Sequence, residues 1–422
     1  MKKRVVVTGM GVVAPNGVGL STFESALRKR ENGVRFQPEL QRLGFRCQIA
    51  GQPEIEQEKL EEFFTPLERK GLRSSGIIYG VIAGMEAWRD AGLVPEENED
   101  PDSGIVFGTG ILGVEKLHEA FALIDQGNVK RLGSTSVLQT MSSGISAFLG
   151  GKLGCGNQVT TNSSACTTGT ESVLMGYDRI VAGKAKRMLV GSCGESGPYV
   201  WGGFDALRIL PYQYNDEPEA ACRPMSATAA GMVPGSGAGA LVIEDLEQAK
   251  ARGATIYAEI LGGAVNSGGQ RNQGSMTAPN SRAVISCIKD ALKESQVEAS
   301  EIDAINGHLT ATAMDIREIE NWMQALGRKG REFPLINSLK GMTGHCLSGA
   351  GSIECVASIL QISRGFVFGN RNCEDLNPAI AELIDSDRVI RETCNIEPQI
   401  VAKASFGFGD VNAVLIFKNY NN

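Results

Sequence analysis

The most constraining feature of the sequence is that one order of strands, loops and helices occurs twice along the chain. The first half runs through RVVVTGMGVV, GIVFGTG, a cysteine-bearing loop with its helix, and GSGAGALVIED. The second half follows the same order with ATIYAEILGGAVNSGG, IDAINGHLTAT, FPLINSLKGMTGHCLSGAGSIECVASIL and VNAVLIFKN. Short Val/Ile-rich strands that alternate with amphipathic helices are typical of α/β proteins with buried mixed sheets. The sequence therefore predicts an α/β fold of two similar halves, residues 1–250 and 251–422, with the loose self-similarity of all α/β sequences as the alternative.

Helical spacing and turn residues predict where the first half forms its helices. We expect helices over residues 20–29, 74–91, about 113–126 and 171–182. The segment up to about residue 62 has weak periodicity and is expected to be a surface elaboration. Residues 198–224 show little regularity and are expected to form an irregular insertion.

The stretch TTNSSACTTGTES places Cys166 on a sharp turn that leads into a helix. Its neighbours are small residues, which leave the sulfur uncovered. A helix N-terminus carries partial positive charge and lowers the pKa of a thiol, so we expect a thiolate near neutral pH. A small cysteine that merely packs in the core is the alternative.

The positions of the histidines are informative because the chain contains only three. His308 lies at a strand end before LTAT, and His345 lies in KGMTGHCLSGAG just before a helix. In a duplicated α/β fold, equivalent strand ends and helix starts meet at one pseudo-twofold site, so both imidazoles are expected to face Cys166. His118 lies inside an amphipathic helix and is expected to be structural.

A glycine-rich loop near the C-terminus, ASFGFGD, is a third candidate element of the site. Its glycines flank Phe406 and Phe408, so the loop could present a backbone N–H to an oxyanion and move an aromatic ring as a gate. A simple glycine turn between two strands is the alternative.

Composition excludes several classes of protein. The net charge of −7 argues against nucleic acid as a partner, and no stretch reaches about 18 uninterrupted apolar residues, which argues against a membrane span. The ten cysteines form no CxxC pair and no zinc-finger spacing with histidine, so we expect reduced thiols and no metal. The opening MKKRVVVTGMG lacks a cleavage site for a signal peptide, which predicts a cytosolic protein.

One activated cysteine with two histidines is typical of acyl transfer through a thioester. The chain resembles the β-ketoacyl-[acyl carrier protein] synthases of the KAS I/KAS II type over nearly its full length. The motifs that carry the resemblance are VTGMGVVAPNG, SSACTTG, GHLTAT, LKGMTGH, GAGSIE and ASFGFG, in the family's order.

The resemblance implies a thiolase-like fold, in which two βαβαβαββ halves form a five-layer αβαβα sandwich. It also implies the decarboxylative condensation of malonyl-ACP with a Cys-bound acyl chain, in fatty acid or in polyketide or aryl-polyene biosynthesis. The catalytic residues implied are Cys166, His308 and His345, with Lys340 and Glu354 in support, and the backbone N–H groups of Cys166 and Phe408 would form the oxyanion hole.

The resemblance further implies residues for substrate and partner binding. Thr277, Thr310 and Thr312 would bind the pantetheine arm, and Ile111 and Met141 would line the acyl pocket. The basic residues expected to dock the acyl carrier protein are Arg69, Lys70, Lys130, Arg131 and Arg208. No cofactor is implied, because the substrates arrive on the phosphopantetheine arm, and a dimer is implied, with an identical chain or a chain-length-factor-like subunit.

The chain departs from the family's pattern at several places. The usual HGTGT reads His308-Leu-Thr-Ala-Thr312, the loop to Asp315 is shorter by one residue, the usual Asn before SFGFG is Ala404, and GFGG ends at Asp410. The triad is complete, so these changes are expected to affect substrate choice. A Cys/His thioester hydrolase and a non-decarboxylating acyltransferase are the alternatives; a thiolase proper would need a second cysteine in the C-terminal glycine loop.

Overall fold

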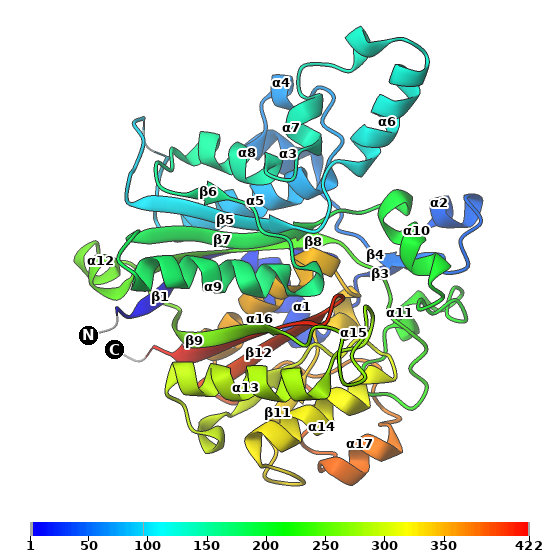
Figure 1. The fold of residues 1–422 in the computed structure, drawn as a ribbon, viewed down its shortest axis with the longest axis vertical. Helices are drawn as coiled ribbons and strands as arrows, with labels where there is room; N and C mark the ends of the chain where they lie inside the picture. The colour runs from blue at the N-terminus through cyan, green and yellow to red at the C-terminus, as the bar shows by residue number, and fades with distance from the viewer. Residues whose placement is uncertain (1–2, 96, 421–422) are drawn as a thin grey trace.

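A computed structural model describes residues 3–95 and 97–420. Its elements stack in five layers, helix, sheet, helix, sheet and helix (Figure 1). The upper outer layer holds α5 (Ser75–Asp90) and α8 (Gly144–Leu153), and the lower one holds α13 (Ser281–Ser295) and α14 (Met314–Leu326). Helices α9 (Thr168–Val181) and α16 (Ala350–Arg364) form the central layer. The predicted five-layer α/β fold is confirmed.

The two half-sheets repeat one pairing pattern, which confirms the duplicated strand order. In the first half β5 (Ser103–Thr109) is parallel to β7 (Arg187–Gly194), which is antiparallel to β8 (Gly237–Asp245), which is antiparallel to β1 (Val5–Ala14). In the second half the same relations join β10 (Ala304–Asn306), β12 (Ile400–Gly407), β13 (Val411–Asn419) and β9 (Ala258–Ser267). The halves meet where β1 pairs with β9, so the described residues form one continuous sheet of 11 strands. The division at residue 250 stays a prediction.

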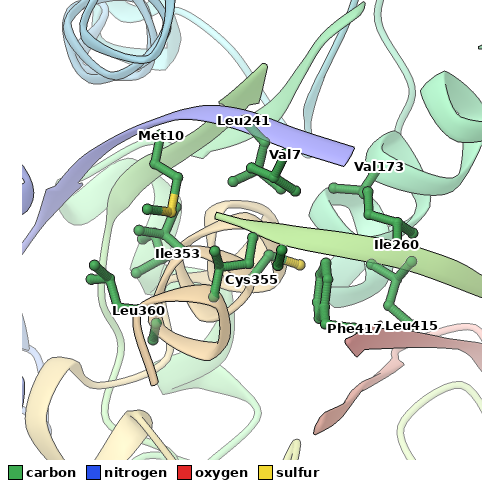
Figure 2. Close-up of a cluster of buried hydrophobic side chains, with 14 of the residues drawn as sticks. Val7, Met10, Val173, Leu241, Ile260, Ile353, Cys355, Leu360, Leu415 and Phe417 are labelled. Carbon is green, nitrogen blue, oxygen red and sulfur yellow. The ribbon is translucent and has the colours of Figure 1, made fainter. Parts of the chain in front are cut away.

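The core between the half-sheets holds the two central helices in place. Side chains from β1, β8, β9 and β13 meet those of α9 and α16 around Val7, Val173, Leu241, Ile353 and Phe417 (Figure 2). Helix α16 is buried over its first 13 residues because it is covered on both faces. Because α16 has no solvent-facing side, its packing fixes the position of its N-terminus. The loop that carries His345 leads into that end.

The remaining elements surround this frame. The structure contains β2 (Gly17–Val18), α1 (Leu20–Lys29), β3 (Val34–Phe36), α2 (Pro38–Arg42), β4 (Ile49–Gly51), α3 (Gln57–Phe63), α4 (Pro66–Arg69), α6 (Val114–Asp125), η1 (Val129–Arg131), α7 (Ser136–Thr140), β6 (Val159–Thr160), η2 (Ala165–Thr167), α10 (Pro198–Ala206), α11 (Pro218–Ala221), α12 (Leu246–Ala251), η3 (Ala299–Glu301), β11 (Leu335–Asn337), α15 (Lys340–Thr343), η4 (Leu347–Gly349) and α17 (Pro378–Leu383).

The expected helices are confirmed, with ends that differ by up to a few residues. The expectation that residues 198–224 are irregular is wrong, because this segment contains α10 and α11. Proline at the first position of each helix has its φ angle already set and no N–H to lose. Among the residues that the structure describes, no helix is long and apolar enough to span a bilayer.

Candidate active site

The Cys166 turn has the strained geometry that its small neighbours suggested. Ala165 has a φ of +50°, and the chain then enters η2 and α9. The hydroxyl of Thr168 fixes the turn, since it accepts from the Ser164 N–H at 2.9 Å and donates to the Ala165 carbonyl at 2.7 Å. Gly407 of β12 lies against this turn, where an added Cβ would be 3.1 Å from the Cys166 nitrogen. The glycine therefore keeps the Cys166 N–H accessible to a ligand.

His345 contacts the Cys166 sulfur directly, as the sequence predicted. Its Nε2 lies 3.1 Å from Sγ, and its Nδ1 accepts a hydrogen bond from the Leu347 N–H at 3.2 Å. Because Nδ1 is an acceptor, the proton of the neutral ring must be on Nε2. His345 is thus placed to donate to a thiolate, or to an oxygen in the same position.

His308 lies beside His345, with ring centroids 5.2 Å apart and planes at 82°. Its backbone is held by Glu318 of α14, whose two carboxylate oxygens accept from the N–H groups of His308 and Leu309, both at 2.7 Å. Asp315, one turn earlier, accepts from Thr310 at 2.8 Å and from Ala311 at 3.2 Å. The sequence reasoning missed this acidic pair, although an Asp and a Glu three residues apart after the histidine loop were a visible signal.

These carboxylates also account for the departures in the HLTAT loop. Ala311 has a φ of +61°, a conformation that costs a residue with a Cβ and that glycine adopts freely. The Asp315 bonds to the loop hold that conformation. Leu309 is buried in the core around α13 and α14, so its side chain points away from the site.

A buried charge cluster lies behind the histidines. Lys340 contacts one oxygen of Glu354 at 2.5 Å, and Lys403 of β12 contacts the other at 2.9 Å. Lys340 and Glu354, each expected to support the site, are paired with each other, and Lys403 was not anticipated. In a strand, a lysine between two alanines has the alternation typical of a residue that faces solvent. Only the structure shows that Lys403 is buried within the sheet.

Burial changes the expected ionisation of the nucleophile. It raises the pKa of Cys166 to about 11, although Lys340 and the Phe408 N–H act to lower it. The expectation of a resting thiolate near neutral pH is therefore wrong, because desolvation outweighs the Lys340 charge and the backbone N–H groups that favour the thiolate. Burial, with Lys340 next, also holds the pKa of His308 and of His345 well below 6.5. The resting site thus contains a thiol and two neutral imidazoles.

A cavity of about 230 Å³ opens onto these groups. Its lining includes Cys166, His308 and His345, together with the threonines expected to bind pantetheine, Thr277, Thr310 and Thr312. The hydroxyls of Thr310 and Thr312 are 3.0 Å apart. Phe408 also lines the cavity, and its ring lies 6.1 Å from that of Phe204. The structure thus gathers the predicted catalytic and arm-binding residues in one place.

Other predicted residues lie elsewhere in the isolated chain. Ile111 is 45% exposed and Met141 is partly buried, and neither lines this cavity. The basic residues lie on three separate segments: Arg69 and Lys70 at α4, Lys130 and Arg131 on η1, and Arg208 after α10. Arg69 pairs with Glu61 at 3.0 Å, while Arg208 directly precedes the cavity residue Ile209. His118 is exposed and stacks on Tyr199 at 4.4 Å.

The Cys166, His308 and His345 ligand atoms lie within 4.8 Å of one another, which is a donor set that soft metals use. The two ammonium groups behind the site work against binding a cation there. The arrangement instead suits nucleophilic attack on a thioester and donation of hydrogen bonds to a developing oxyanion. The expectation that no cofactor is needed stays a prediction.

Known proteins of one family match this chain over nearly its whole length. Residues 2–249 match the β-ketoacyl synthase N-terminal domain, and residues 257–374 match the β-ketoacyl synthase C-terminal domain. The chain is 33% identical to 3-oxoacyl-[acyl-carrier-protein] synthase 1 of Escherichia coli K12, and 30% identical to synthase 2 of Vibrio harveyi, with 99% of each chain covered.

Solved structures agree with these relatives. A β-ketoacyl synthase from Burkholderia phymatum superimposes with a TM-score of 0.89 at 31% identity, covering 99% of this chain and 100% of that one. A type II polyketide ketosynthase in complex with its acyl carrier protein, AntDE:AntF, gives a TM-score of 0.88 at 29% identity, with both chains fully covered. The ishigamide ketosynthase/chain length factor gives 0.88 at 27% identity, also with full coverage.

Proposed function

Because the chain belongs to the β-ketoacyl synthase family and is an acyltransferase of the 3-oxoacyl-[acyl-carrier-protein] synthase type, we propose that Cys166 carries the acyl chain while His308 and His345 act on the malonyl extender. The carrier protein would deliver both substrates on its phosphopantetheine arm. The reaction is the condensation step of fatty acid or polyketide synthesis.

The first half-reaction moves the acyl group to the enzyme. The Cys166 sulfur attacks the thioester carbonyl, the bond to pantetheine sulfur breaks, and the cysteine proton ends on the departing pantetheine thiol. The N–H groups of Cys166 and Phe408 would hold the oxyanion, and Gly407 leaves room for that oxygen. The neighbouring Nε2–H of His345 stabilises the thiolate as it forms.

The second half-reaction forms the carbon–carbon bond. Malonyl carboxylate leaves as CO₂, its electron pair becomes an enolate, and the enolate carbon attacks the Cys166 thioester. The cysteine leaves as a thiolate and takes up a proton, which balances the step. Two neutral imidazoles aimed at one point would stabilise the enolate oxygen more than the ground-state carbonyl, which lowers the barrier.

One observation carries this proposal: a thiol, two imidazoles and three threonine hydroxyls line one cavity. The test is to incubate the enzyme with acyl-ACP and malonyl-ACP and to identify the product. We expect β-ketoacyl-ACP and CO₂. Free fatty acid without condensation product would identify a thioester hydrolase and contradict the proposal.

We also propose that the protein works as a dimer. The segment from α6 to α7 projects from the body at the top of Figure 1. Apolar side chains are exposed along it, among them Phe121 at 60%, Val129 at 57% and Val137 at 69%. This surface would be covered by a second copy, and the segment after Leu132 would reach the partner's acyl pocket. A chain-length-factor-like partner, as in the ishigamide system, is the other candidate.

The carrier protein would dock near the cavity mouth. Arg208 is exposed next to the cavity residue Ile209, which makes it the best placed of the predicted basic residues. A chain of net charge −7 needs such local positive charge to attract an acidic partner.

A cytosolic location also stays a proposal.

A further inference from the structure

Lys403 is a charged residue that is fully buried in the middle of a strand. It lies on β12, its side chain has 0% exposure, and its neighbours Ala402 and Ala404 are also fully buried. Its ammonium contacts Glu354 Oε2 at 2.9 Å and donates to Thr170 Oγ1 at 2.8 Å, to the Ala404 carbonyl at 3.0 Å and to the Ser405 hydroxyl. These partners are all oxygen atoms, which suit an ammonium donor.

The charges of the cluster do not cancel. Glu354 lies between Lys340 and Lys403, so two ammonium groups share one carboxylate. Taking a charge out of water is costly unless it is paired, and an unbalanced cluster is therefore expected to serve a purpose besides folding. The excess positive charge lies next to a thiol that must become a thiolate and two imidazoles that must stay neutral.

We propose that Lys403 is a positioning residue for the condensation: by balancing the Glu354 carboxylate, it leaves the charge of Lys340 free to act on Cys166, His308 and His345. Without Lys403 the Glu354 carboxylate would neutralise Lys340, and the cluster of Lys340, Glu354 and Lys403 would lose its net positive charge. This inference rests on the proposed function of the same site.

The surroundings of the histidines support this role. The titratable and charged groups that act on the site come from several elements: Cys166 of η2, Asp315 and Glu318 of α14, Lys340 of α15, Cys346, Glu354 of α16 and Lys403 of β12. After burial, the positive charges of Lys340 and Lys403 both lower the pKa of His308 and of His345. Protonating His345 would also place a hydrogen on Nδ1. That hydrogen would repel the Leu347 N–H, from which Nδ1 accepts a hydrogen bond in the neutral ring.

The first test is Lys403→Met, which keeps an unbranched side chain only one atom shorter and removes its charge. The rate of Cys166 alkylation by iodoacetamide at pH 8 should fall about tenfold, as for a thiol pKa raised by about one unit. NMR of labelled imidazoles gives a readout that is independent of turnover, since the chain has only three histidines. We expect the pKa of His308 or of His345 to rise in the variant, because a positive charge that lowers it has been removed, while the signal of exposed His118 does not change.

The matched control is Lys116→Met. Lys116 is another buried lysine, 5% exposed, which pairs with Glu119 at 3.1 Å on α6. This variant should alkylate at the wild-type rate. An equal fall in both variants would mean a general cost of losing a buried lysine, and it would overturn the proposal.

The double variant Lys403→Met/Glu354→Gln separates charge from packing. It removes one positive and one negative charge, so the cluster has the same net charge as in the wild type and no carboxylate is left short of a partner. We expect its alkylation rate to return to within about threefold of the wild type, even if the single variant folds poorly. A double variant as slow as Lys403→Met would mean that only packing matters.

The two proposals fail in different ways. If the wild-type enzyme forms β-ketoacyl-ACP but Lys403→Met leaves the alkylation rate and the histidine titrations unchanged, only the role of Lys403 is contradicted. If the wild-type enzyme forms no condensation product, the proposed function itself is contradicted.

Discussion

At the scale of single residues, the site depends on how burial and local charge oppose each other at Cys166. Burial raises the pKa of the thiol to about 11, and the Lys340 charge and the Phe408 N–H recover only part of that shift. In the proposed mechanism the cysteine would react because a donor 3.1 Å away stabilises its thiolate as it forms, and not because it is ionised at rest. The helix start predicted from the sequence locates the nucleophile along the chain, but it does not show how deeply the thiol is buried.

This ionisation predicts how alkylation of Cys166 depends on pH. The rate constant for iodoacetamide should rise about tenfold per pH unit between pH 7 and 9, because the thiolate fraction grows in that proportion below a pKa of about 11. Intact-mass analysis follows the single adduct, with Cys166→Ala as the control for other cysteines. A rate that levels off below pH 8 would contradict this account.

The two histidines should matter more for condensation than for acyl loading. His308→Ala or His345→Ala removes one enolate donor and should slow malonyl decarboxylation by about two to three orders of magnitude. Radiolabelled CO₂ release measures that step, and transfer of the acyl group from its carrier measures loading separately. Wild-type CO₂ release in both variants would show that the imidazoles do not act on the extender.

At the scale of elements, the turn between β12 and β13 is tied to the loop that carries Thr277. Asp410 is 1% exposed and has a φ of +62°. Its carboxylate accepts from the Asn280 N–H at 2.8 Å and the Gln270 N–H at 2.9 Å, and the Gly409 N–H donates to the Met276 carbonyl at 2.8 Å. The aspartate that replaces the family's usual glycine thus couples the Phe408 turn to one wall of the cavity.

Replacing Asp410 should loosen this coupling in a graded way. Asp410→Gly leaves two backbone N–H groups without their acceptor and should lower the free energy of unfolding by about 1–3 kcal/mol, offset in part by the ease with which glycine adopts a positive φ. Asp410→Asn keeps one acceptor oxygen and should fall between glycine and the wild type. Urea unfolding measures the order, and a glycine variant as stable as the wild type would contradict the coupling.

Whether a feature could be predicted from the sequence depends on whether neighbouring residues or distant ones determine it. The Cys166 turn, the α9 helix and the strand order follow from neighbouring residues, and the structure bears them out. Lys403 was missed because its partner Glu354 is distant in the sequence. Glu318 and Asp315 were missed because their partners are backbone N–H groups, although their spacing after the histidine loop was visible. The helix α10 was missed because Gly202 and Gly203 lie in its middle, where glycine disfavours a helix.

At the scale of the whole molecule, the duplicated sheet explains why one site draws on both halves. Equivalent elbows, η2 before α9 and η4 before α16, meet in the central layer, so Cys166 comes from one half and His345 from the other. The exposed apolar segment from α6 to α7 belongs to the first half and lies outside this layer. Its exposed apolar side chains are the observation on which the proposed dimer rests.

A charge placed on that segment should weaken self-association. Val137 is 69% exposed, and Val137→Glu should shift the protein from dimer to monomer at micromolar concentration, because an interface core disfavours an unpaired carboxylate. Val94→Glu, at a site that is 71% exposed outside the segment, is the control and should remain dimeric. Sedimentation velocity distinguishes the two, and a wild-type protein that is already monomeric would contradict the dimer.

The most direct test of the central claim is the mass of the enzyme through one catalytic cycle. After incubation with acyl-ACP, the wild-type protein should gain the mass of one acyl group, and Cys166→Ala should gain none. Adding malonyl-ACP should then remove the adduct as β-ketoacyl-ACP appears. An adduct that persists on Cys166→Ala, or one that malonyl-ACP does not discharge, would contradict the assignment of Cys166 as the acyl carrier of a condensing enzyme.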